Sequence, residues 1–131
     1  MSVDKQEVRT KAAPAPVGPY AQAVVHGGLV YASGQIPLDP ATGSLVSGDI
    51  EAQTERVFAN LRAVLEAAGA SFDSLLRVSI YLTDLSLFPR VNEVYARQLG
   101  EGPKPARSTL GVAALPLGAA IEVDAIAAQE S

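Results

Sequence analysis

The chain has 131 residues, of which 48% are hydrophobic and 18% are charged, and its formal net charge is −4. This length and composition are typical of one folded globular domain rather than a disordered chain. The acidic balance disfavours nucleic acid as a partner, and no apolar run approaches the roughly 20 residues that span a bilayer. Since the polar start of the chain is also unlike a signal peptide, we expect a single cytoplasmic domain over residues 1–131 that binds neither nucleic acid nor membrane.

Two scarce residue types restrict the chemistry. The chain has no cysteine and a single histidine, His26. The absence of cysteine excludes disulfides and thiol nucleophiles, and a single histidine excludes a His-rich metal centre. His26 stands just before Gly27 and Gly28, which are typical of a hairpin turn, and we interpret it as exposed and idle. Any catalysis must then come from carboxylates, hydroxyls, arginine and the backbone.

The N-terminal part is predicted to be an arm followed by two strands. Residues 1–16 are polar and then rich in proline, so we expect an irregular or extended arm, flexible over residues 1–12. Strands are expected over residues 21–25 and 29–33, on either side of the glycine turn.

Three polar or small residues flank these strands. Tyr20 stands at the entrance of the first strand, where its ring can pack in the core or its phenol can face a ligand. Ser33 and Gly34 begin a loop rich in turn-forming residues after the second strand. Such loops often hold binding groups at the end of a strand, although this signal alone is weak.

A long helix and a strand follow. The helix is expected over residues 50–68, with Asp49 as its N-cap and Gly69 as its stop. Residues 76–83 alternate between apolar and polar side chains, which predicts a strand with one face on the helices. The residues assigned to that buried face are Leu76, Val78, Ile80 and Leu82.

A second helix is predicted over residues 87–99, with Ser86 as its cap. Pro89 is harmless in the first turn, where amide protons lack intrahelical partners. Asn92 lies on the border of the apolar stripe, and the pattern alone indicates only contact with solvent. A linker with two prolines then leads to the last strands.

The C-terminal part carries the candidate site. Strands over residues 106–114 and 119–127 are predicted to pair as a hairpin, and in that register Glu122 lies on the same face as Arg107. The two side chains would then flank a pocket for a small anion. Charged residues on one hairpin face can also be merely solvated, but small neighbours such as Gly111 leave the backbone approachable by a ligand.

This order of elements predicts an α+β domain, with a mixed sheet and both helices on one face. The other face would carry Arg77, Tyr81 and Asp124 among small and apolar residues. A face this mixed favours an oligomer interface with sites between subunits.

Six segments together carry a family resemblance. They are PAPVGPY at 14–20, SGQIP at 33–37, YLTD at 81–84, VNEVY at 91–95, PARS at 105–108 and IEVDAIA at 121–127. Each segment alone is modest evidence. In this order, over about residues 13–127, they resemble the RidA/YjgF family of reactive-intermediate deaminases.

The resemblance implies a chorismate-mutase-like fold and a homotrimer with clefts between subunits. It also implies cofactor-independent hydrolysis of enamines or imines released by PLP enzymes, such as 2-aminoacrylate, 2-iminopropanoate and 2-iminobutanoate, to 2-oxo acids and ammonia. Arg107 carries over as the carboxylate anchor and Glu122 as the residue that positions water. The pocket residues carried over are Tyr20, Ser33, Gly34, Asn92 and Thr109. Thr109 stands where archetypal members commonly have cysteine, which bears on substrate preference.

The chemistry of these residues agrees with the resemblance. A planar guanidinium at Arg107 can hold a carboxylate through two parallel hydrogen bonds, which lysine would not reproduce. A partly shielded Glu122 would have a raised pKa and could both accept and donate a proton. Since an imine is already reactive, positioning and modest acid-base help suffice, and no metal or organic cofactor is expected.

Two other functions fit the same residues. One is a binding or regulatory protein that holds 2-oxo acids without chemistry. The other is a protein-interaction role, as a chaperone or translation inhibitor, for which the acidic balance argues against direct RNA cleavage.

Overall fold

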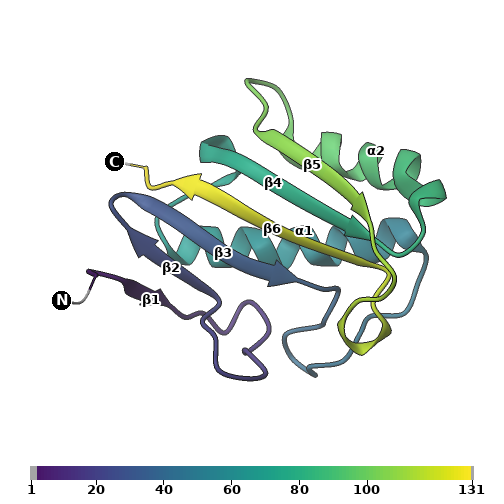
Figure 1. Ribbon diagram of the computed structural model, residues 1–131, viewed down its shortest axis with the longest axis horizontal. Helices are drawn as coiled ribbons and strands as arrows, with labels where there is room; N and C mark the ends of the chain where they lie inside the picture. The colour runs from purple at the N-terminus through teal and green to yellow at the C-terminus, as the bar shows by residue number, and fades with distance from the viewer. Residues whose placement is uncertain (1–2, 131) are drawn as a thin grey trace.

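The computed structural model describes residues 3–130, which form one sheet with two helices packed against it (Figure 1). Residues 1 and 2 of the predicted arm, and residue 131 of the predicted domain, lie outside the described residues. The strands are β1 (Gln6–Val8), β2 (Ala23–His26), β3 (Leu29–Gln35), β4 (Leu75–Leu82), β5 (Ala106–Gly111) and β6 (Ile121–Ala128). The helices are α1 (Ile50–Ala67) and α2 (Phe88–Leu99), with short 3-10 turns η1 (Phe72–Ser74), η2 (Leu85–Leu87) and η3 (Pro116–Gly118).

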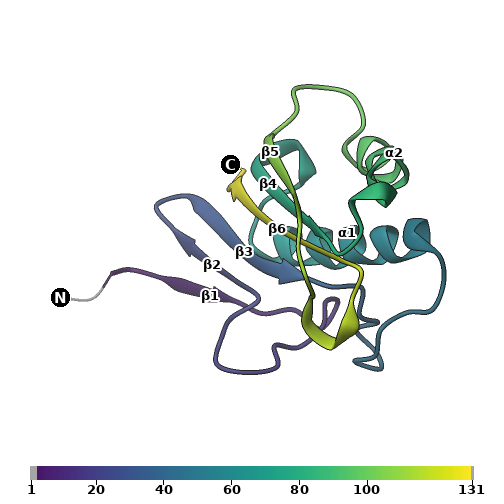
Figure 2. The same cartoon turned by 45° about the vertical axis from the view of Figure 1, so that its right-hand side comes forward.

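The strands are arranged in the order β1-β2-β3-β6-β4-β5. β4 and β5 run parallel, while the other neighbouring pairs run antiparallel. Both helices cover the same face of the sheet (Figure 2). The predicted α+β fold, with a mixed sheet and both helices on one face, is therefore confirmed. Within residues 3–130, neither helix is long and apolar enough to cross a membrane.

β5 and β6 do not form the predicted hairpin, because β4 lies between them (Figure 1). Tyr81 of β4 pairs with Leu110 of β5 on one side and with Glu122 of β6 on the other. The unit β4–α2–β5 is a strand-helix-strand crossover, which returns the chain parallel to the strand it left. The hairpin register predicted for Arg107 and Glu122 is therefore wrong.

The N-terminal arm is held against the sheet. Residues 6–8 form edge strand β1, paired with β2, so the prediction of a flexible arm is corrected there. Gln22 is buried and anchors the following residues through its amide. Its Oε1 accepts a hydrogen bond from the Thr10 N–H at 2.8 Å, and its Nε2 donates to the Pro14 carbonyl at 2.9 Å.

The ends of α1 match their prediction and the start of α2 does not. The Asp49 carboxylate accepts a hydrogen bond from the Ala52 N–H at 2.9 Å, and Gly69 ends α1 with φ 81°. α2 begins at Phe88 without a side-chain cap, so Ser86 is not its cap. The Ser86 N–H instead donates to Asp84 in η2, at 3.0 Å.

β4 contains an irregularity that moves one predicted core residue to the surface. Leu75 pairs with Ala127 and Arg77 with Ile126, so β4 holds one extra residue. Leu75 is buried and Leu76 is 48% exposed, which corrects the prediction for Leu76. Beyond this bulge the alternation holds, and the side chains buried as predicted are Val78, Ile80 and Leu82.

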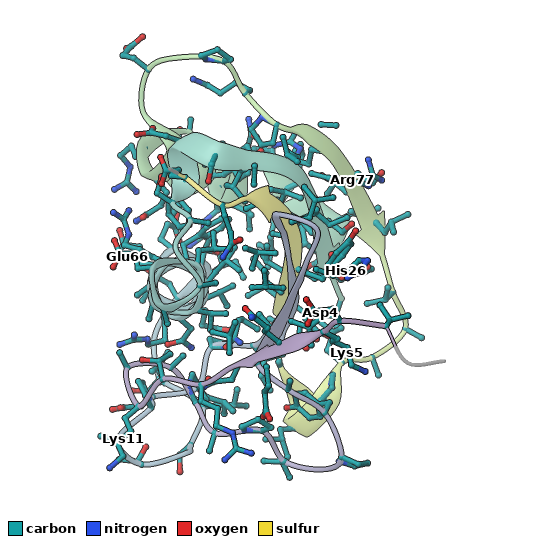
Figure 3. The ribbon with its side chains drawn as sticks, turned by 90° about the vertical axis from the view of Figure 1, so that its left-hand side faces the viewer. Asp4, Lys5, Lys11, His26, Glu66 and Arg77 are labelled. Carbon is teal, nitrogen blue, oxygen red and sulfur yellow. The ribbon has the colours of Figure 1, made fainter. Side chains whose placement is uncertain are left out.

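The core lies between the sheet and the helices. Phe58 of α1 is fully buried and meets the ring of Tyr95 in α2 edge to face, at 5.8 Å between centroids. Figure 3 shows the layers from the side, with Glu66 on the helix side and Arg77 on the face that no helix covers. We call this second side the open face of the sheet.

Candidate active site

A pocket of about 410 Å³ lies where β3 ends and β6 begins. Four of the residues proposed from the sequence line it together, namely Tyr20, Ser33, Gly34 and Glu122. The remaining lining residues come from the N-terminal arm, the loop after β3 and η3; they are Pro14, Ala15, Val17, Gln22, Gln35, Ile36, Leu38, Pro116 and Leu117.

A bulge in β3 shapes the polar side of this pocket. Ala32 pairs with Ala125 and Gln35 with Val123, so Ser33 and Gly34 together span one position of β6. Bulges of this kind turn backbone and side chains out of the regular ladder, often beside functional sites. The Ser33 hydroxyl donates to the Ala21 carbonyl at 2.6 Å, which holds the bulge against the start of β2.

Gly34 allows the Glu122 carboxyl group to lie directly on the backbone of β3. A Cβ atom added at Gly34 would lie 2.8 Å from the carboxyl carbon of Glu122, closer than side-chain carbons approach one another. No side chain other than hydrogen fits at position 34 while Glu122 keeps this position.

Burial and one charged neighbour on the open face determine the electrostatics of Glu122. Burial raises the pKa of the Glu122 carboxyl, and the charge of Asp124 raises it further. Tyr81 lies opposite Glu122 in β4, and its hydroxyl donates a hydrogen bond to Asp124 at 3.0 Å. That bond is also the main reason why the Tyr81 pKa is raised. Glu122 is therefore a half-buried carboxyl that holds a proton more readily than a free one.

Arg107 lies on the helix side of the sheet. It pairs with Val78, whose side chain is fully buried beneath the helices. Its guanidinium donates to the Asn92 side-chain oxygen at 2.8 Å and lies over the rings of Phe88 and Tyr95, at 5.1 and 4.8 Å from their centroids. Among residues 3–130 no carboxylate forms an ion pair with it. An exposed guanidinium held by neutral groups is available to an anionic ligand.

Thr109 shares this side of β5 with Arg107, because alternate residues of a strand face the same way. Its hydroxyl oxygen is buried, with no hydrogen-bond partner among the described residues. The helix pattern alone indicates only contact with solvent for Asn92, whereas the structure shows its side-chain oxygen fixing Arg107.

The predicted site residues therefore fall into two groups on opposite faces of one sheet. The pocket group contains Glu122, and the Arg107 group is completed by Asn92 and Thr109. One strand, β4, lies between β6, which carries Glu122, and β5, which carries Arg107. A small molecule in the pocket cannot reach Arg107 of the same chain through the sheet.

Some residues near the site were not found from the sequence. The buried Asn60 of α1 donates to the Leu38 carbonyl at 2.9 Å and fixes the loop after β3. The signal for Asn60 in the sequence was its position inside the apolar stripe of a helix, where a polar residue is unusual. His26 is exposed, as predicted, and its Nδ1 lies 2.6 Å from the backbone oxygen of Asp4 beside β1 (Figure 3). Within residues 3–130, no group of three or more His, Asp or Glu side chains is arranged to hold a metal ion.

Known proteins resemble this chain over almost its whole length. A family model described as Endoribonuclease L-PSP matches residues 10–129. A RutC family protein of Pyrococcus abyssi is 48% identical over 96% of this chain and 98% of its own length. A 2-iminobutanoate/2-iminopropanoate deaminase of Dermatophagoides farinae is 41% identical over 93% of this chain and 94% of its own length.

Solved structures of related proteins have closely similar folds. The crystal structure of RidA from an Antarctic Psychrobacter species matches with a TM-score of 0.89 and 46% identity, over 94% of this chain and 98% of that one. The fold is thus that of the Rid proteins, as the resemblance predicted. The chain belongs to the RidA/YjgF family, which the matching model describes under the name Endoribonuclease L-PSP.

Proposed function

We propose that this protein hydrolyses 2-imino acids and their enamine tautomers, such as 2-iminobutanoate and 2-aminoacrylate, to 2-oxo acids and ammonia. The observation that carries the proposal is the Glu122 carboxyl, half-buried in a pocket over the Gly34 backbone with a raised pKa. A carboxyl with a raised pKa holds a proton more readily than a free one, so it can both take and return a proton during a reaction. The name of the Dermatophagoides farinae relative describes the same reaction.

The complete site in this proposal lies between two subunits of a homotrimer. One subunit contributes the pocket with Glu122, and its neighbour contributes Arg107 with Asn92 and Thr109. Three features support this assembly. The two groups cannot meet within one chain, the Arg107 guanidinium lacks an ion-pair partner among the described residues, and the open face carries exposed apolar side chains such as Tyr31 and Leu110.

The proposed reaction begins with the substrate carboxylate on Arg107, held through two parallel hydrogen bonds. This places the C2 carbon of the imine near Glu122. Glu122 accepts a proton from water as the oxygen bonds to C2 of the protonated imine and the electron pair of the C=N bond moves to the nitrogen. The resulting carbinolamine carries the former water oxygen and the amine on the same carbon.

The second half of the reaction returns the proton. Glu122 protonates the nitrogen, the C–N bond breaks, and ammonia leaves with the bonding electrons. The hydroxyl loses its proton to Glu122 as the 2-oxo group forms. Glu122 then gives that proton to the departing ammonia, so one protonated imine and one water become one 2-oxo acid and one ammonium ion, with no oxidant and no external acid. Since the imine is electrophilic from the start, orientation and this single carboxyl account for the acceleration.

The direct test couples a threonine dehydratase to the protein and follows 2-oxobutanoate formation. We expect the wild type to accelerate the step that follows imine release, and Arg107→Ala and Glu122→Gln each to lower kcat/KM by about 100-fold or more. Equal rates with and without the wild-type protein would exclude the deaminase. If 2-oxo acids still bound under those conditions, the pocket would belong to a binding protein instead.

Mixing the two variants tests the shared site. In randomly mixed trimers of Arg107→Ala and Glu122→Gln, about a quarter of the interfaces combine an intact Glu122 with an intact Arg107. Refolding the mixture should restore about that share of wild-type activity, while each variant refolded alone stays inactive. No recovery in trimers shown to be mixed would mean that the site lies within one chain.

A further inference from the structure

The pocket has a polar end and an apolar end. Ser33, Gly34 and Glu122 form the polar end at the β3 bulge. The apolar end is built by three separate segments of the chain, which contribute Pro14, Ala15 and Val17 from the arm, Ile36 and Leu38 from the loop after β3, and Pro116 and Leu117 from η3. The proposed chemistry uses the polar end and the Arg107 group, and gives the apolar end no role.

Leu117 is held at this apolar end in an unusual backbone conformation. Its φ is 58° and its ψ is 18°, and it is the one non-glycine residue with positive φ among residues 3–130. Side chains larger than hydrogen rarely adopt this left-handed region, and such residues concentrate at ligand sites. The Leu117 side chain is 68% exposed, so packing within this chain does not explain its position. The turn instead presents an apolar side chain to the pocket.

The other two segments of the apolar end are fixed by buried polar groups. Asn60 donates to the Leu38 carbonyl at 2.9 Å, and Gln22 donates to the Pro14 carbonyl at the same distance. Both amides are almost fully buried, so these bonds are shielded from water. The apolar end is therefore formed before any ligand arrives, which limits the ordering cost of binding.

We propose that the apolar end receives the side chain of the substrate, and that the protein prefers 2-imino acids with an extended apolar side chain over those with three or four carbons. This inference rests on the proposed function, because it takes C2 of the imine to lie at Glu122. The three remaining directions from C2 then serve the carboxylate, the nitrogen and the side chain. Within the pocket, the apolar end offers the side chain a matching surface.

The size of the pocket agrees. At about 30 Å³ per non-hydrogen atom, the share of one molecule in liquid water, the seven atoms of 2-iminobutanoate occupy about 210 Å³. The pocket measures about 410 Å³, which leaves room for a branched aliphatic or aryl side chain. Each added methylene that leaves water gains about fourfold in affinity, so the preference for a leucine-derived over an alanine-derived imine should exceed tenfold.

The experiment compares imines generated in place by an L-amino acid oxidase from alanine, leucine and phenylalanine. We expect kcat/KM to be at least tenfold higher for the leucine and phenylalanine imines than for the alanine imine. Leu117→Ala should lower the two larger values by about fivefold and lower the alanine value by a smaller factor. Leu76→Ala is the matched control, since Leu76 is an exposed leucine outside the pocket and should change nothing.

A second variant distinguishes the loss of the Leu117 side chain from a change in the backbone of η3. Asn tolerates positive φ, so Leu117→Asn keeps the backbone of η3 and removes the apolar side chain. It should reproduce the selective loss seen with Leu117→Ala. Equal kcat/KM for all three imines, or an equal loss for all three in both variants, would overturn the inference while leaving the deaminase in place.

Calorimetric binding separates this inference from the proposed function. 4-Methyl-2-oxopentanoate and phenylpyruvate should bind the wild type at least tenfold more tightly than pyruvate, and Leu117→Asn should remove most of that difference. If this order holds although no imine is hydrolysed faster, the apolar end is supported and the deaminase is not. If pyruvate binds as tightly as the larger acids, the apolar end has no part in selection.

Discussion

Replacing Gly34 with alanine tests the link between the β3 bulge and Glu122. The new Cβ would overlap the Oε2 atom of the Glu122 carboxyl group and lie 2.8 Å from its carboxyl carbon, so the carboxyl group must move by more than about 1 Å to restore an ordinary contact of 3.4 Å. The carboxyl is the free end of a flexible side chain, so it can move at little cost in stability. Since alanine also restricts the unfolded chain, we expect the free energy of unfolding to change by less than about 1 kcal/mol.

The catalytic effect of the same change should be large. A misplacement of about 1 Å at a reacting group costs on the order of 100-fold in rate, so a shift of at least that size should lower kcat/KM by about 100-fold or more. Urea denaturation measures the stability, and the coupled dehydratase assay measures kcat/KM. The two readouts should separate clearly, with activity lost and stability kept.

A double-mutant cycle identifies the cause. In a Glu122→Ala background the added Cβ meets no carboxyl, so Gly34→Ala should cause no further loss of activity or of 2-oxo acid binding. Wild-type activity in the single variant would refute the contact on which the argument depends. A full further loss in the Glu122→Ala background would show that Gly34 acts by another route, such as backbone contact with the ligand.

Three further predictions concern single side chains. Because the pKa of Glu122 is raised, activity that needs its carboxylate is lost as the pH falls through that raised value. Asp124→Asn removes the neighbouring charge that helps to raise this pKa, and it should move the acidic limb of the kcat/KM profile to lower pH. An unmoved limb would contradict the effect of Asp124 on Glu122. Gln22→Ala removes the side-chain hydrogen bonds that hold the N-terminal arm, and it should lower the free energy of unfolding in urea by about 2–4 kcal/mol. A loss under about 1 kcal/mol would mean that other contacts hold the arm. Thr109→Val replaces a buried hydroxyl that lacks a partner among residues 3–130 and should raise that free energy by about 1 kcal/mol; a decrease would show that the hydroxyl is satisfied in the assembled protein.

Local patterns in the sequence predicted local structure well. Asp49 and Gly69 marked the ends of α1, and the alternation around Glu122 placed that residue opposite the buried side of β6. These features depend on residues within one or two turns or a single strand, where side-chain period and capping decide the outcome.

Pairing between strands was the main error, and its cause is physical. The turn residues before β6 are the same whether the chain folds back on β5 or crosses to the far side of β4. The order strand, helix, strand did contain the needed signal, because a helical crossover normally joins parallel neighbours. With β5 parallel to β4, Arg107 follows Val78 to the helix side, and the separation from Glu122 could have been deduced. The bulge that exposes Leu76 had no such signal, since one extra residue leaves the alternation of the letters unchanged.

The position of β5 at the edge of the sheet has a consequence for how turnover depends on protein concentration. An isolated chain keeps its anion-holding arginine and its proton-transferring carboxyl on surfaces that no single small molecule can touch at once. Under the proposed assembly, specific activity should therefore fall on dilution in parallel with dissociation of the subunits, even where each separated chain stays folded.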